Sequence, residues 1–146
     1  MTGPRSHIII VEARFYGDLA DEMAAGAVAA LEQAGASHER VAVPGTFEIP
    51  AAIGFAAESG RFDGYVALGC VIRGQTTHYD YICQESARAL QDLATVNGMA
   101  IGYGILTCEN RDQAWVRADR DQGNKGRAAA QTCLAMLDLR RRFESP

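Results

Sequence analysis

Strand-like and helix-like segments alternate along this chain, and this alternation restricts the possible folds more than any other feature of the sequence. Short apolar segments predict strands at residues 8–11, 40–43, 65–72 and 100–106. Between and after them, apolar spacing predicts helices at residues 19–34, 50–59, 77–97, 111–119 and 125–143. Strands joined through helical crossovers form a parallel sheet with helices on both faces. The sequence therefore predicts a three-layer α/β/α sandwich with a four-stranded parallel sheet, and its 146 residues fit a single domain, 1–146.

Residues that favour helix ends agree with these boundaries. Asp18 is expected to cap the first helix, and Pro50 falls in the first turn of the second, where its missing N–H costs nothing. Gly98 follows Asn97 at the end of the third helix, where a left-handed residue commonly stops a helix.

Charge and hydropathy argue against two classes of partner. The chain carries 14 Lys and Arg against 18 Asp and Glu, a formal charge of −4, which disfavours nucleic acid and anionic membrane surfaces. Its apolar runs are far shorter than the ~20 residues of a membrane span. Residues 1–7 lack the features of a secretory signal. We expect a cytoplasmic protein that binds neither nucleic acid nor membranes.

The cysteines, Cys70, Cys83, Cys108 and Cys133, form no C-x-x-C pair, and no histidine is spaced to complete a zinc site. We expect them to be reduced and mostly buried, and we expect no metal.

Ligands of parallel α/β sheets bind beyond the carboxyl ends of the strands. The segment after the third predicted strand runs through Gly74 into a helix, and it places Gln75, Thr76 and Thr77 at the helix N-terminus. Such a terminus favours anions, so these residues predict a phosphate site; the alternative is that Thr76 or Thr77 is only an N-cap.

Other residues beside the strand ends each have two interpretations. His78 can act as a general acid or base, or can be structural. Phe15 can stack on a planar ring, or can belong to the core. Glu48 can accept hydrogen bonds from ligand hydroxyls, or can complement a helix dipole. Arg117 and Lys125 can bind phosphate, or can be ordinary surface charges.

Three longer segments and one short one carry a family resemblance: Val43–Pro50, Ala67–Tyr81, Gly104–Asn110 and Gly123–Gly126. They strongly resemble the 6,7-dimethyl-8-ribityllumazine synthases, and the similarity extends over nearly the whole chain. The resemblance implies a flavodoxin-like/lumazine synthase fold and a transferase of riboflavin biosynthesis. In its penultimate step, 5-amino-6-(D-ribitylamino)uracil condenses with 3,4-dihydroxy-2-butanone 4-phosphate to give 6,7-dimethyl-8-ribityllumazine, phosphate and water. No cofactor is implied.

The resemblance also implies a role for each matching residue. Phe15 would stack on the pyrimidine, and Val71 and Ile72 would offer backbone groups to the uracil edge. The ribityl chain would lie against Thr46, Phe47 and Glu48.

On the phosphate side, Gln75 and Thr76 would bind the phosphate with Arg117, and His78 would transfer protons. In the family, the residues matching Tyr103, Arg117 and Lys125 come from a neighbouring subunit, and of these Tyr103 and Lys125 would help to bind the aminouracil and its ribityl chain. The resemblance therefore implies a homo-oligomer with shared sites, either a pentamer or a 60-subunit shell of pentamers. The short N-terminal segment favours a pentamer.

Two positions depart from the family pattern. Tyr16 stands where the family usually has Asn, and Tyr103 replaces the commoner Phe. Three other functions stay open: a riboflavin synthase of the archaeal type, a flavin- or lumazine-binding module without turnover, and a flavodoxin-like signalling or scaffold domain. Tyr16 motivates the binding module, whereas the scaffold leaves Thr76, Thr77 and His78 unexplained.

Overall fold

Four parallel strands form one sheet in the spatial order β2-β1-β3-β4. The computed structural model describes residues 5–144. The strands are β1 (His7–Ala13), β2 (Ser37–Val43), β3 (Gly64–Ile72) and β4 (Ile101–Cys108). Each contains one of the segments predicted as a strand or overlaps most of it, so the predicted parallel sheet is confirmed.

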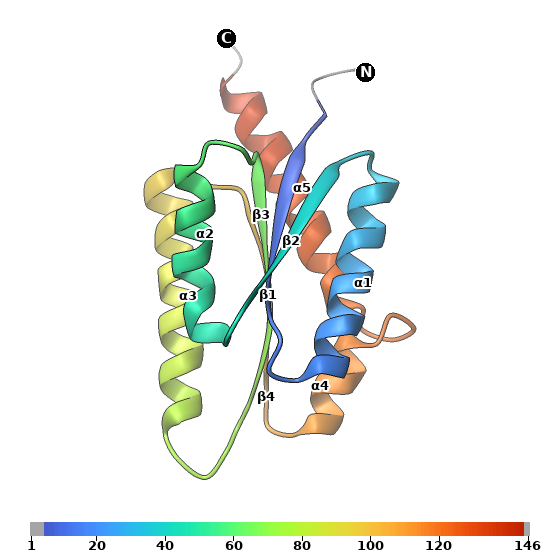
Figure 1. The fold of residues 1–146 in the computed structure, drawn as a ribbon, viewed down its shortest axis with the longest axis vertical. Helices are drawn as coiled ribbons and strands as arrows, with labels where there is room; N and C mark the ends of the chain where they lie inside the picture. Colours follow the sequence, from blue (N-terminus) through green and yellow to red (C-terminus); the bar gives the residue numbers. More distant parts are fainter. Residues whose placement is uncertain (1–4, 145–146) are drawn as a thin grey trace.

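Helices cover both faces of the sheet, as Figure 1 shows. On one side lie α2 (Ile49–Glu58) and α3 (His78–Asn97); on the other lie α1 (Gly17–Gln33), α4 (Arg111–Ala118) and α5 (Lys125–Glu144). The side chains of β1 alternate between the two layers: Ile8 and Ile10 belong to the core under α1 and α5, and Ile9 and Val11 to the core under α2. A strand covered on both faces has no polar face, which explains the uninterrupted apolar run. The predicted three-layer sandwich is confirmed.

Helix ends follow the sequence signals with one exception. Pro50 lies in the first turn of α2, and Gly98 ends α3 in the left-handed conformation with φ 65°. The predicted capping role of Asp18 is wrong, because α1 begins at Gly17 and its N-cap position is Tyr16. Asp18 instead lies in the first turn of α1, where its negative charge interacts favourably with the helix dipole. Its carboxylate also pairs with Arg111 at the start of α4.

A short helix, η1 (Thr46–Glu48), was not predicted from the sequence. The structure also shows how far each cysteine is buried. Cys108 and Cys133 are buried, and Cys70 and Cys83 are half-buried, all as free thiols. Within residues 5–144, no three histidine, cysteine or acidic side chains are grouped so that they could hold a metal ion. The same part of the chain contains no helix with the length and apolar character needed to cross a membrane.

Asn110 caps α4, the helix that carries Arg117. Its Oδ1 accepts the N–H of Gln113 at 2.9 Å, and Gln113 Oε1 accepts the N–H of Glu109 at 2.8 Å. We expect Asn110→Ala to lower the free energy of unfolding by about 1 kcal/mol. Thermal unfolding at matched protein concentration measures this change, with Asn110→Ser as a control that keeps a capping oxygen. Equal melting temperatures for Asn110→Ala and wild type would contradict it.

Candidate active site

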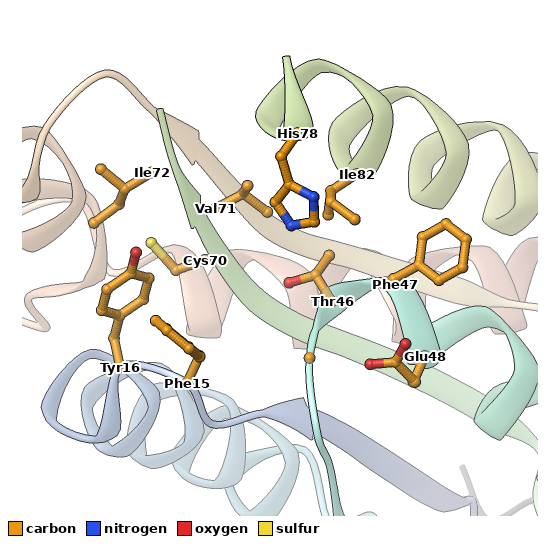
Figure 2. Close-up of a pocket in the computed structure, with 11 residues that line it drawn as sticks. Phe15, Tyr16, Thr46, Phe47, Glu48, Cys70, Val71, Ile72, His78 and Ile82 are labelled. Atoms are coloured by element: carbon orange, nitrogen blue, oxygen red, sulfur yellow. The ribbon is translucent and has the colours of Figure 1, made fainter. Parts of the chain in front are cut away.

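A cavity of about 570 Å³ opens at the carboxyl ends of β1 and β3, between η1 and the first turn of α3. Figure 2 shows its lining. Seven residues singled out in the sequence meet there: Phe15, Thr46, Phe47, Glu48, Val71, Ile72 and His78. They come from three segments far apart in the chain, around residue 15, residues 46–48 and residues 71–78. Parallel strands end at a common edge of the sheet, and for this reason the segments that follow them converge.

Aromatic rings occupy two sides of the cavity. Phe15 is 77% exposed and Phe47 is 55% exposed, although both are large apolar side chains. Phe15 and Tyr16 form an edge-to-face pair, with ring centroids 4.9 Å apart and an interplanar angle of 80°. Tyr16 is half-buried against the core, and this burial raises the pKa of its phenol. A ring left uncovered at the edge of a cavity offers a stacking surface for a planar ligand.

Polar groups face the same space. Thr46 is buried against Gly69 of β3, which has no side chain. A Cβ atom added at Gly69 would lie only 2.7 Å from Thr46 Oγ1, so the space that Thr46 occupies exists because residue 69 is glycine. Glu48 folds back over Gly45, where a Cβ would lie 3.2 Å from its carboxylate oxygen. The imidazole of His78 projects from the start of α3 into the cavity, above Thr46 (Figure 2). The cavity thus combines a hydroxyl, a carboxylate and an imidazole with an apolar lining.

The end of β3 supplies backbone groups as well. Pairing of β1 with β3 ends at Glu12 and Leu68, whereas pairing of β3 with β4 continues to Ile72. Residues 69–72 therefore extend beyond β1 along the cavity, and the edge of β3 that faces it is not paired with β1. Amide and carbonyl groups on such an edge can bind the hydrogen-bonding edge of a heterocycle.

Four lining residues were not among the predicted site residues: Tyr16, Gly45, Cys70 and Ile82. Tyr16 is one of the positions that depart from the family pattern, and this departure is the signal in the sequence that marks it. Ile82 follows His78 by one helical turn, and this i, i+4 spacing could have indicated it. Burial raises the pKa of the Cys70 thiol to about 12, so it is protonated near neutral pH. Because the thiolate is the nucleophilic form, Cys70 is not suited to nucleophilic catalysis.

The loop between β3 and α3 contacts the end of β4. Its Arg73 backbone N–H donates to Cys108 O at 2.9 Å. The guanidinium donates through Nε to Glu109 at 2.9 Å and through Nη1 to Asp80 at 3.3 Å, and it lies 4.3 Å from the ring centroid of Tyr79. Both carboxylates compete for this cation, which leaves Arg73 poorly suited to bind a ligand phosphate.

The predicted phosphate residues lie beside the cavity rather than in its lining. Gln75 and Thr76 are exposed in the loop before α3. Thr76 Oγ1 accepts the N–H of His78 at 3.3 Å, whereas the N-cap residue Thr77 makes no side-chain capping bond. Thr76 thus accepts the N–H of the first residue of α3 without occupying its N-cap position, and the exposed loop leads into the N-terminus of a long helix.

The remaining predicted residues line a different hollow. Tyr103, Arg117 and Lys125 lie around a space of about 300 Å³ bordered by β4, α4 and α5. It shares no lining residue with the first cavity. Arg117 Nη1 donates to Gln113 O at 3.0 Å. Within residues 5–144, neither Arg117 nor Lys125 forms an ion pair with a carboxylate, so this hollow presents two cations to an incoming anion.

Comparisons with known proteins indicate a family. Residues 5–141 match the family model described as 6,7-dimethyl-8-ribityllumazine synthase. A protein named 6,7-dimethyl-8-ribityllumazine synthase 1 from Rhizobium meliloti is 55% identical over 142 residues, which are 94% of this chain and 93% of the relative. The synthase of Sphingopyxis alaskensis is 54% identical, covering 94% and 97% of the two chains, and that of Bartonella tribocorum is 52% identical, covering 95% and 93%.

Proposed function

Because the chain belongs to the 6,7-dimethyl-8-ribityllumazine synthase family, we propose that the cavity at the ends of β1 and β3 is the aminouracil half of its active site. The enzyme condenses 5-amino-6-(D-ribitylamino)uracil with 3,4-dihydroxy-2-butanone 4-phosphate, releasing phosphate and water. The observation that carries the site assignment is the meeting of the exposed Phe15 ring, Glu48 and His78 in one cavity.

In this proposal each wall of the cavity binds one part of the aminouracil. The pyrimidine stacks on Phe15, which is the exposed planar surface at the end of β1. Its polar edge meets the backbone at Val71 and Ile72, where β3 extends beyond β1. The ribityl chain lies against Thr46, Phe47 and Glu48, and the Glu48 carboxylate accepts hydrogen bonds from its hydroxyls.

His78 moves protons between the reactants. The amine of one substrate attacks the ketone of the other, and the carbinolamine must lose water to become an imine. An imidazole at the mouth of the cavity can protonate the departing hydroxyl and can later take a proton as phosphate is eliminated. Amines and ketones react without a catalyst, so holding them in the correct orientation supplies much of the acceleration.

The phosphate half of the site requires a second subunit. We assign phosphate binding to Gln75 and Thr76 at the start of α3, together with Arg117 from a neighbour. Arg117, Lys125 and Tyr103 lie around a hollow separate from the cavity of their own chain. When the hollow of one copy faces the cavity of the next, the contact is head-to-tail, and such contacts form a ring where the rotation between copies closes. We propose that residues 1–146 form one domain of a cytoplasmic homopentamer with shared sites.

The proposed function is tested by mixing purified protein with both substrates. Lumazine absorbance and phosphate release are followed together, above the uncatalysed rate. Stoichiometric formation of both products is expected. Tight lumazine binding without turnover would favour the binding module, and riboflavin formation from lumazine alone would favour a riboflavin synthase.

Arg117→Ala should weaken binding of the phosphorylated substrate. Removing the cation removes attraction for the phosphate, whereas the groups around the amine stay in place. We expect the KM for the butanone phosphate to rise by about tenfold, with a smaller change in kcat and in the KM for the aminouracil. Steady-state kinetics with each substrate varied in turn measures this.

Arg120→Ala provides the matched control. It also removes an arginine, but Arg120 lies beyond the end of α4, and its guanidinium already pairs with Glu22 at 2.9 Å. An Arg117→Ala enzyme with an unchanged KM for the butanone phosphate would refute the assignment.

A further inference from the structure

A buried carboxylate interrupts the apolar pattern of β1. Ile8 and Ile10 face the core under α1 and α5, and Glu12 continues the same alternating row along the strand. Glu12 is only 3% exposed. Removing a charge from water is costly unless it is paired and hydrogen-bonded. Glu12 therefore needs partners within the fold, and none of the groups that pair with it lines the cavity.

Two arginines satisfy this carboxylate. Arg40, on the neighbouring strand β2, donates to Glu12 through both Nε and Nη2, the latter at 3.0 Å. Arg14, in the turn after β1, donates through Nη1 to Glu12 Oε1 at 2.8 Å. Arg14 also pairs through Nη2 with Asp21 of α1. The four groups carry two positive and two negative charges, so the network is neutral and links β2, β1, the turn and α1.

The turn held by Arg14 carries the Phe15 ring. Phe15 is 77% exposed, and its one ring contact among the described residues is the edge-to-face contact with Tyr16. Core packing therefore does little to fix its position, which depends on the backbone on either side. After the ring, Ala20 N–H donates to Tyr16 O at 2.9 Å in the first turn of α1. Before it, the side-chain contacts of Arg14 link the turn to β1 and α1.

We propose that Glu12 is a positioning residue for the aminouracil: through Arg14 it fixes the turn after β1 and so holds the Phe15 ring at the orientation in which it stacks. The inference rests on the proposed function of the cavity. Buried ion pairs add little net stability compared with apolar side chains of similar size, whereas they do restrict geometry. A ring with little packing of its own needs that restriction.

The two arginines allow the positioning role to be separated from a structural one. Both pair with Glu12, but only Arg14 belongs to the turn that carries Phe15. We expect Arg14→Met to raise the KM for the aminouracil by about tenfold, because a displaced ring no longer stacks. At saturating aminouracil, kcat should change less. Calorimetric titration with 6,7-dimethyl-8-ribityllumazine should show a matching loss of affinity, and Glu12→Gln should behave in the same way.

Arg40→Met is the matched control. It removes a partner from the same carboxylate but leaves the bond between Glu12 and Arg14, so it should lower the melting temperature while KM and lumazine affinity stay within about twofold of wild type. Ile8→Val, at the other end of β1, controls for loss of stability alone. Arg14 is partly exposed, with a side chain 32% accessible, so Arg14→Met keeps the test available if Glu12→Gln does not fold.

The inference is overturned if Arg14→Met leaves KM and lumazine affinity unchanged, or if Arg40→Met changes them equally. Phe15→Ala separates this failure from a failure of the proposed function. If the wild type forms lumazine and Phe15→Ala loses affinity for the aminouracil, but Arg14→Met does not, only the positioning role is wrong. If the wild type neither turns over nor binds lumazine, the proposed function itself fails.

Discussion

Replacing His78 with alanine is expected to slow lumazine formation by about 10²- to 10⁴-fold without abolishing it. His78 is the one imidazole in the lining of the cavity, so no other described histidine there can take over the proton transfers. The remaining rate comes from holding the amine and the ketone together, which the Phe15 ring and the strand end of β3 continue to do. The measurement is kcat from lumazine absorbance, with the KM of both substrates expected to change little.

His38→Ala is the matched control for this variant. His38 lies on β2 near Glu32, with 3.7 Å between Nε2 and the carboxylate, and it is absent from the cavity lining. We expect full activity from it. A correctly assembled His78→Ala protein with no turnover would show that proton transfer, rather than orientation, dominates catalysis. Turnover by His78→Ala at the wild-type rate would show that His78 takes no part in the mechanism.

Mixed assemblies of two impaired variants should recover activity. His78→Ala damages the cavity of its own chain, whereas Arg117→Ala damages the separate hollow that we assign to the neighbouring site. In assemblies formed from equal amounts, about a quarter of the sites combine an intact cavity with an intact hollow, since each half is intact with a probability of about one half. At low butanone phosphate, the mixture should far exceed the sum of the separate activities.

Co-expressed or co-refolded subunits provide this measurement. The control mixes His78→Ala with the doubly substituted chain, in which no intact site can form. Recovery in the first mixture and none in the control is expected. Activity of the first mixture no greater than the sum of the two separate variants would place the two halves of the site within one chain and would refute the shared site.

The sheet and its helices could be predicted because their signals are local. The run from Ile8 to Val11 needs no partner to indicate a doubly covered strand, and Gly98 stops α3 through its own backbone freedom. The convergence of Phe15, Thr46 and His78 also followed from topology, since parallel strands end at one edge. These predictions needed no side-chain geometry.

Other features depend on contacts between distant segments. Arg73 follows the end of β3 and Arg117 lies in the last turn of α4, and only the structure shows that Glu109 and Asp80 engage the first of them. Asp18 had the sequence context of an N-cap, but its pairing with Arg111, 93 positions away, belongs to the tertiary fold. The burial of Thr46 likewise depends on the missing side chain of Gly69 on another strand.

Because two carboxylates engage Arg73, attraction of the phosphorylated substrate depends, in the proposed site, on Arg117. The chain carries a formal charge of −4, so the summed long-range field opposes a phosphate. At physiological ionic strength, charges are screened beyond about 8 Å, and repulsion and attraction both act only near the surface. In the proposed site, Arg117 would therefore act on a phosphate that arrives by undirected diffusion. We expect capture of this substrate to depend on its residence time in the site, and electrostatic steering to add little to its rate of arrival.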